Sequence, residues 1–136
     1  MSEQRSSPVR FLGVAPSFAV RDVVEAAEYY RDRLGFEILG YFAEPPVYAM
    51  VRRGIVQVHF GRTTADDVRT AADYRGSVGI DAYVWVEDAD RLYDEFTARG
   101  ANIVEGPVDR VYNCREIVVR DPNGFTIAFG SDVPER

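Results

Sequence analysis

The chain has 136 residues, with 16 Lys and Arg against 22 Asp and Glu, a formal net charge of −6, one histidine and one cysteine. This length suits a single domain with a sizeable core, and the negative charge argues against nucleic acids and anionic membranes as partners. A single cysteine excludes a disulfide within the chain, and no apolar run is long enough to span a bilayer. We therefore expect a soluble protein of a reducing compartment, the cytoplasm.

The chain divides into two halves of similar pattern. We predict flexible tails at residues 1–10 and 131–136, a first module at 11–61, a connector at 62–78 and a second module at 79–130. Within the connector, Thr64 followed by Asp67 resembles a capping box, so we expect a short helix there.

Each half is expected to contain one amphipathic helix. Asp22 and Asp88 are suited to cap the first turn, because a carboxylate can accept hydrogen bonds from unpaired backbone N–H groups. Gly35 and Gly100 suit the left-handed residue that follows a helix. The two halves repeat this arrangement about 65 residues apart, which is too long for a solenoid unit. We interpret them as a duplicated supersecondary module.

The strands that accompany these helices have one apolar face and one mixed face of polar and aromatic residues. Around 56–60, for example, Val56, Val58 and Phe60 alternate with Gln57 and His59. Each half reads as strand, helix and three strands. We predict an α+β fold of two paired βαβββ modules, whose curved mixed sheets surround a cleft lined by the mixed faces, with helices on the outer, apolar face.

Four segments together resemble the vicinal oxygen chelate superfamily, which includes glyoxalase I, extradiol dioxygenases and bleomycin resistance proteins. They are VRDVVEAAEYYRDRLGFE (20–37), VQVHFGR (56–62), AYVWVEDADRLYDEF (82–96) and REIVVRDPNGFTIAF (115–129). The resemblance covers residues 12–130, and its details are most similar to the bleomycin resistance type. It implies paired βαβββ modules, assembled as a homodimer with clefts near the module interface. It leaves open whether the modules pair within one chain or between chains.

The enzymes of this superfamily hold a divalent metal on inward-facing strand positions, typically through His, Glu or Gln. The matching positions in this chain are Ala15, Gln57, Asp81 and Ala128. Alanine cannot ligate a metal, and catalytic sites normally need three protein ligands. We therefore expect no metal, no cofactor and no catalytic residue of the family type, although a rearranged site of His59, Asp81 and Glu116 stays open.

The aromatic residues of the mixed faces are candidates for ligand contact. Tyr83 and Trp85 would present flat apolar area and π faces to a planar or cationic ligand. Tyr48 and Phe42 in the first module are weaker candidates of the same kind. Gln57 and His59 would line the cleft as hydrogen-bonding residues. The alternative for the aromatic residues is packing across a module or dimer interface.

Asp81 and Glu116 are predicted by strand alternation to face the same cleft. Two carboxylates in a partly desolvated cleft would raise each other's pKa unless a cation joins them, which favours a cationic ligand. The alternative is that each pairs with a nearby arginine, Arg115 or Arg120.

These observations favour a metal-independent small-molecule binding protein. By resemblance, it would sequester a planar, antibiotic-like compound, cationic or neutral. Two other functions stay open. One is a metal-dependent lyase or dioxygenase with a rearranged site, and the other is a metabolite-binding module without a role in resistance.

Overall fold

The structure is a computed structural model that describes residues 7–74 and 79–134. Residues 1–6 and 135–136, which belong to the tails predicted at 1–10 and 131–136, and residues 75–78 of the predicted connector lie outside the described residues. Within the described ranges, no helix is long and apolar enough to cross a membrane.

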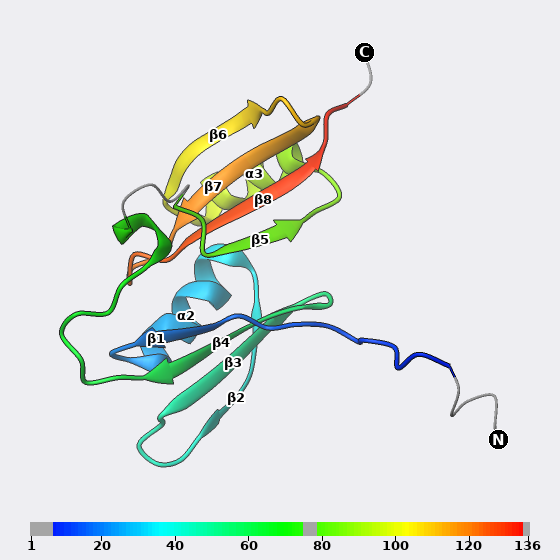
Figure 1. Ribbon diagram of the computed structural model, residues 1–136. Coiled ribbons are helices and arrows are strands. Elements are labelled where there is room, and N and C mark those ends of the chain that lie inside the picture. The colour runs from blue at the N-terminus through cyan, green and yellow to red at the C-terminus, as the bar shows by residue number, and fades with distance from the viewer. Residues whose placement is uncertain (1–6, 75–78, 135–136) are drawn as a thin grey trace.

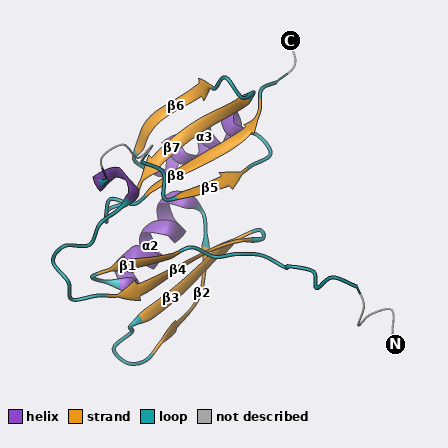
Figure 2. Cartoon of the chain, in the orientation of Figure 1, coloured by secondary structure: helices purple, strands orange, loops and turns teal. Residues whose placement is uncertain are grey.

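The first module forms a four-stranded sheet with one helix on its apolar face (Figures 1 and 2). Its elements are β1 (Ser17–Val20), α2 (Val23–Leu34), β2 (Glu37–Phe42), β3 (Tyr48–Arg53) and β4 (Val56–Arg62). The strand order is β1-β4-β3-β2; β1 runs parallel to β4 and the other neighbours are antiparallel.

The second module repeats this topology with the order β5-β8-β7-β6, in which β5 is parallel to β8. Its elements are β5 (Ala82–Trp85), α3 (Ala89–Arg99), β6 (Ile103–Asp109), β7 (Cys114–Arg120) and β8 (Thr126–Asp132). The predicted α+β fold of two βαβββ modules is thus confirmed. The last strand continues to Asp132, two residues past the predicted end of the module.

The helix ends follow the sequence signals. The Asp22 carboxylate accepts hydrogen bonds from two backbone N–H groups in the first turn of α2, and the Asp88 carboxylate accepts one at the start of α3. Gly35 and Gly100 follow the helices with φ of 76° and 79°, a conformation that costs glycine little. All four predicted end residues are confirmed.

The connector contains a single 3-10 turn, η1 (Ala71–Asp73), among its described residues. The predicted capping box at Thr64 and Asp67 is wrong, because the same Thr-x-x-Asp pattern occurs again at Thr70 and Asp73 and the turn forms there. The Asp73 carboxylate accepts a 2.8 Å hydrogen bond from the Thr70 backbone N–H. The second copy is favoured because the first N–H of η1 also bonds to a carboxylate of the second module.

The two modules share one hydrophobic core, in which α2 lies between the two sheets (Figure 1). Phe18 of β1 stacks on Phe125, which precedes β8, with ring centroids 4.2 Å apart. The buried Tyr30 hydroxyl of α2 donates a 2.7 Å hydrogen bond to Asp121 of the second module. No strand of one described sheet pairs with a strand of the other, so β1 and β5 both remain edge strands.

Candidate functional site

The predicted ligand-binding residues form two separate groups, one on the mixed face of each sheet. Phe42, Tyr48, Gln57 and His59 belong to the first sheet, and Asp81, Tyr83, Trp85 and Glu116 to the second. Among the described residues, the two groups make no hydrogen bond or ring contact with each other. The single chain therefore does not bring all eight residues into one site.

On the first sheet, Tyr48, His59 and Gln57 form a hydrogen-bonded row. The Tyr48 hydroxyl lies 2.9 Å from His59 Nδ1, and Gln57 Oε1 lies 2.9 Å from His59 Nε2. In the neutral tautomer with the proton on Nε2, His59 donates to Gln57 and accepts from Tyr48. The strand register places Met50 opposite His59. Phe42, at the end of β2, is 68% exposed beside this row.

On the second sheet, Tyr83, Trp85 and Glu116 lie together. The Tyr83 and Trp85 rings have centroids 5.0 Å apart, and the indole is 77% exposed. The Tyr83 hydroxyl donates a 2.7 Å hydrogen bond to Glu116, which is buried. This contact depends on Gly130, because a Cβ at that position would overlap the Tyr83 hydroxyl. The result is an aromatic surface fixed from behind by a buried carboxylate.

Glu116 receives further hydrogen bonds from two residues that sequence reasoning did not select. Arg110 Nε lies 2.8 Å from one carboxylate oxygen, and the Tyr112 hydroxyl lies 2.7 Å from the other. Burial by itself raises the pKa of Glu116, but the hydrogen bonds from Arg110, Tyr112 and Tyr83 outweigh it and hold that pKa below its usual value. Glu116 is therefore an ionised acceptor whose charge is already paired.

The pKa of the Tyr83 phenol is shifted in the opposite direction from that of Glu116. Burial and the hydrogen bond to Glu116 raise the pKa of Tyr83 well above its usual value. Tyr83 is therefore a neutral hydrogen-bond donor throughout the physiological range. The pair of Tyr83 and Glu116 presents no free negative charge to the exposed face.

Asp81 does not share a site with Glu116. Its two carboxylate oxygens accept 2.8 Å hydrogen bonds from the backbone N–H groups of Ala71 and Thr126, which tie the connector to β8. The two carboxylates were predicted to face one cleft, but their hydrogen-bond partners are separate: backbone N–H groups for Asp81, and the side chains of Arg110, Tyr112 and Tyr83 for Glu116. The alternative prediction, that Glu116 pairs with Arg115 or Arg120, is also wrong, because the arginine that contacts Glu116 is Arg110.

Arg110 could not be selected from spacing alone. It precedes the turn between β6 and β7, and it reaches Glu116 across that turn while also pairing with Glu105. Arg115, which is adjacent to Glu116 in sequence, points to the opposite face and pairs with Asp109 and Asp90. The opposite direction of Arg115 could have been predicted from the alternation of β7, because neighbouring residues in a strand face opposite sides.

The residues at the family's metal-ligand positions do not fit a metal. The side chains of Ala15 and Ala128 have no metal-ligating atom, Gln57 Oε1 is hydrogen-bonded to His59, and both Asp81 carboxylate oxygens accept backbone hydrogen bonds. Among the residues that the structure describes, no three His, Cys, Asp or Glu side chains lie close enough together to hold a metal ion. His59, Asp81 and Glu116 in particular do not converge. No chemical step through a metal follows from this arrangement.

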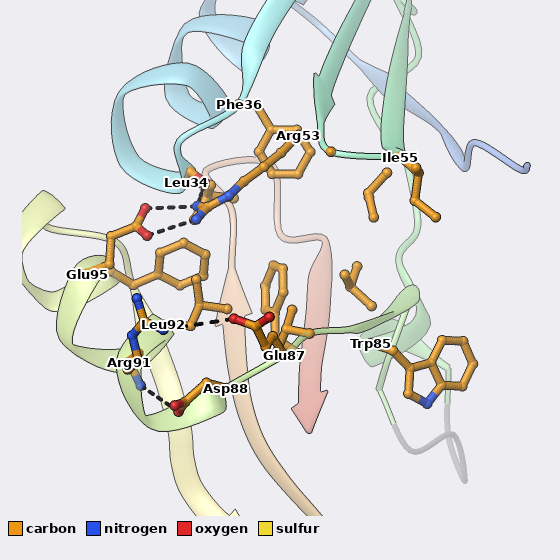
Figure 3. Close-up of a pocket in the computed structure, with 16 residues that line it drawn as sticks. Leu34, Phe36, Arg53, Ile55, Trp85, Glu87, Asp88, Arg91, Leu92 and Glu95 are labelled. Atoms are coloured by element: carbon orange, nitrogen blue, oxygen red, sulfur yellow. Dashed lines mark hydrogen bonds and ion pairs between the residues drawn. The ribbon is translucent and has the colours of Figure 1, made fainter. Parts of the chain in front are cut away.

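A groove with a volume of about 620 Å³ lies elsewhere, between the two modules (Figure 3). We call it the intermodule groove. Its lining includes apolar residues of both modules, and its charged residues are Arg53, Glu87, Asp88, Arg91 and Glu95. Of the eight predicted site residues only Trp85 borders it, with its ring turned outward (Figure 3). Sequence reasoning did not anticipate this groove.

Comparison with known proteins identifies the family. Residues 14–129 match the model of the Glyoxalase/Bleomycin resistance protein/Dioxygenase superfamily, and the chain belongs to this superfamily. The predicted resemblance is thereby confirmed. No curated protein matches the chain.

Several solved structures are similar. The structure of TioX from Micromonospora sp. ML1 is 25% identical, with a TM-score of 0.70, and the match covers 88% of this chain and 98% of that one. The bleomycin-binding protein of Streptomyces verticillus, solved with copper(II)-bleomycin, is 26% identical, with a TM-score of 0.64 and coverage of 94% and 100%. A superfamily member from Sphaerobacter thermophilus is 22% identical with a TM-score of 0.68, covering 91% and 98%, and supports the fold alone.

Proposed function

We propose that this chain is a small-molecule binding protein that sequesters a planar, antibiotic-like compound without using a metal. The observation that carries the proposal is the aromatic surface made by the exposed Trp85 and the half-buried Tyr83, whose hydroxyl is hydrogen-bonded to the buried Glu116. An exposed indole beside a fixed phenol offers flat apolar area whose burial by a ligand is favourable. The bleomycin-binding relative supports this class of function.

The binding surface is proposed to be completed in a homodimer. The mixed faces of the two sheets carry separate groups of candidate residues within one chain, and β1 and β5 are edge strands with one neighbour each. Unpaired edges are natural places for association. In the proposed dimer, the row of Tyr48, His59 and Gln57 from one copy and the aromatic surface from the other line one cleft.

The proposed ligand is recognised by stacking and hydrogen bonding more than by charge. The Glu116 carboxylate is paired with Arg110, and Asp81 bonds to backbone N–H groups, so neither is free to neutralise a cation. A cationic ligand would instead meet the π faces of Trp85 and Tyr83. The negative net charge of the chain would contribute only long-range attraction.

The experiment is calorimetric titration of the purified protein with copper(II)-bleomycin, metal-free bleomycin, planar aromatic cations and their neutral isosteres. We expect saturable binding of at least one planar compound, recovered unchanged after dissociation. Recovery of a chemically altered compound would favour a lyase or dioxygenase, and a metal that stays bound in stoichiometric amount after dialysis would contradict the metal-independent mechanism. Binding of none of these compounds would overturn the proposed ligand class.

A further inference from the structure

The carboxyl-terminal ends of the two helices cap each other across the module boundary. The guanidinium of Arg33, in α2, donates a 3.0 Å hydrogen bond to the backbone carbonyl of Arg99, the last residue of α3. The guanidinium of Arg99 donates in turn to the carbonyl of Asp32, in the last turn of α2, at 3.4 Å. The last carbonyls of a helix have no partner within the helix, and its negative end favours a cation. Each helix is therefore completed by an arginine of the other module.

A third arginine reaches the same place from the first sheet. Arg53, at the end of β3, donates a 2.9 Å hydrogen bond to the carbonyl of Leu34 and 2.8 Å hydrogen bonds to both carboxylate oxygens of Glu95 in α3 (Figure 3). Glu95 also accepts a hydrogen bond from Arg99 Nε at 2.9 Å. The hydrogen bond from Arg53 holds the pKa of Glu95 below its usual value, against the effect of burial. We call Arg33, Arg53, Glu95 and Arg99 the arginine latch.

The two glycines that follow the helices leave room for the latch. A Cβ at Gly35 would lie 2.7 Å from Arg53 Nη1, and a Cβ at Gly100 would overlap the Arg33 guanidinium. Gly54 also has a positive φ, of 61°, but a Cβ there would meet nothing within 4 Å. A left-handed backbone by itself therefore does not bring a guanidinium so close. At both helix ends, glycine provides the backbone conformation and also the space that an arginine of the latch occupies.

The latch and the shared core hold the modules together in different ways. Apolar contacts such as that of Phe18 with Phe125 are attractive but non-directional. The planar fork of Arg53 on the Glu95 carboxylate fixes both distance and orientation. The side chains of this pair are 39% and 33% exposed, and ion pairs with such exposure contribute little to stability. The latch therefore determines the geometry of the modules more than it contributes to the free energy of unfolding.

We propose that the arginine latch positions the two modules, so that Arg53 and Glu95 fix the angle between the sheets and with it the placement of the two mixed faces. The inference rests on the proposed function, in which a ligand cleft combines the mixed faces of both modules. In the proposed dimer each chain contributes one face to each of two clefts, so a changed angle within one chain displaces a wall of both. The latch residues are positioning residues, since none of them belongs to the candidate ligand-binding residues of either face.

The first test measures the distance between the modules without any ligand. Spin labels are attached at Ile55→Cys in the first module and at Val111→Cys in the second, in a Cys114→Ser background that has no other thiol. Ile55 and Val111 are 94% and 101% exposed, so the labels should not disturb the fold. The labelled chain is diluted with an excess of unlabelled chain, so that double electron–electron resonance reports distances within one chain.

We expect one narrow distance distribution with the intact latch and a broadened or shifted one with Glu95→Gln. Arg53→Lys should act in the same way, because lysine keeps the charge but not the planar fork. Glu87→Gln is the matched control, because Glu87 also borders the intermodule groove but has a 92% exposed side chain and only a 3.8 Å ion pair with Arg91. A Glu95→Gln distribution identical to that of the control would overturn the proposal.

A rescue experiment tests the contact between Gly100 and Arg33. Gly100→Ala should lower Tm by about 4 °C or more beyond the loss in Gly54→Ala. Both variants add a Cβ at positive φ, but only the one at Gly100 displaces a latch arginine. Combining Gly100→Ala with Arg33→Ala, measured against Arg33→Ala alone, should recover most of this excess. Equal losses at the two glycines, or no recovery in the double variant, would contradict the role of Arg33 in the latch.

A binding measurement separates this inference from the proposed function. The probe is copper(II)-bleomycin or a planar aromatic cation that the wild type binds. If Glu95→Gln leaves a tenth of the chains in the binding-competent orientation, affinity falls by about tenfold. Its Tm should change by less than about 3 °C, because the ion pair is partly exposed, and Glu87→Gln should bind like the wild type.

The outcomes of the two assays are distinguishable. Unchanged affinity in Glu95→Gln would overturn the positioning role and leave binding by the aromatic surface intact. Absence of binding by the wild type would overturn the proposed function, whereas the spin-label distances would still decide whether Arg53 and Glu95 fix the angle between the modules.

Discussion

The Tyr83 hydroxyl reaches the Glu116 carboxylate, 2.7 Å away, by lying directly across Gly130 of β8. The aromatic surface of the second sheet therefore depends on the absence of a side chain at one position of the neighbouring strand. Glycine in a strand interior often marks such a close approach. The pair links the exposed face, where a ligand would bind, to the buried charge network behind it.

Gly130→Ala is expected to displace the Tyr83 ring and break its hydrogen bond. The free energy of unfolding should fall by roughly 1–3 kcal/mol, because an added methyl in a packed region forces neighbouring groups to move. Urea denaturation monitors this change, and binding of planar compounds should weaken in parallel. Gly40→Ala is the control, since an added Cβ there would meet nothing within 4 Å. An equal loss in both variants would contradict the specific role of Gly130.

Glu116→Gln is expected to make the free energy of unfolding less dependent on pH in the acidic range. The pKa of Glu116 is lowered in the folded state, so the ionised form stabilises the fold above the usual glutamate pKa of about 4.3. That contribution disappears as the pH falls through the lowered folded-state pKa. At pH 7 the variant should be less stable by roughly 1–3 kcal/mol.

The measurement is urea denaturation of wild type and Glu116→Gln between pH 7 and pH 3. The difference in unfolding free energy should shrink as the pH decreases. Glu87→Gln is the control, because the Glu87 side chain is 92% exposed. A difference that stays constant over this range would show that the charge of Glu116 does not contribute to stability.

The sequence predicted the fold and the face of each strand but not the partners of the charged groups. Strand alternation correctly placed His59 beside Gln57 and Tyr83 beside Trp85, because the period of two depends only on local backbone geometry. The contact of Arg110 with Glu116 depends on the irregular register of β6, which shifts between Glu105 and Val108. Such shifts have no simple sequence signal.

A second limit of strand alternation explains why the candidate residues were predicted to line one cleft. Alternation assigns residues to a face, but it does not say which faces of two sheets meet. Here the two modules meet on their apolar side, where Phe18 stacks on Phe125 and the Tyr30 hydroxyl of α2 donates a hydrogen bond to Asp121. The mixed faces are consequently left for contacts outside the chain.

Asp81→Asn is expected to reduce stability rather than the preference for cationic ligands. The Asp81 carboxylate accepts two 2.8 Å backbone hydrogen bonds, and an amide nitrogen cannot replace one of these acceptors. The loss should be about 1–3 kcal/mol, measured by thermal or urea denaturation. Asp66→Asn is the control, because that side chain is 93% exposed. A selective loss of affinity for cations over neutral isosteres would restore Asp81 as a ligand residue.

Trp85→Ala is expected to weaken binding of a planar ligand while leaving the fold almost unchanged. The indole is 77% exposed, so its removal should change the free energy of unfolding by less than about 0.5 kcal/mol. Binding should weaken by roughly 1–3 kcal/mol, through lost apolar contact and, for a cation, a lost π contribution. Calorimetry should be done at a concentration where variant and wild type sediment alike, so that assembly does not enter the comparison. Val111→Ala should bind like the wild type, and a Trp85→Ala variant with unchanged affinity would show that the ligand binds away from this aromatic surface.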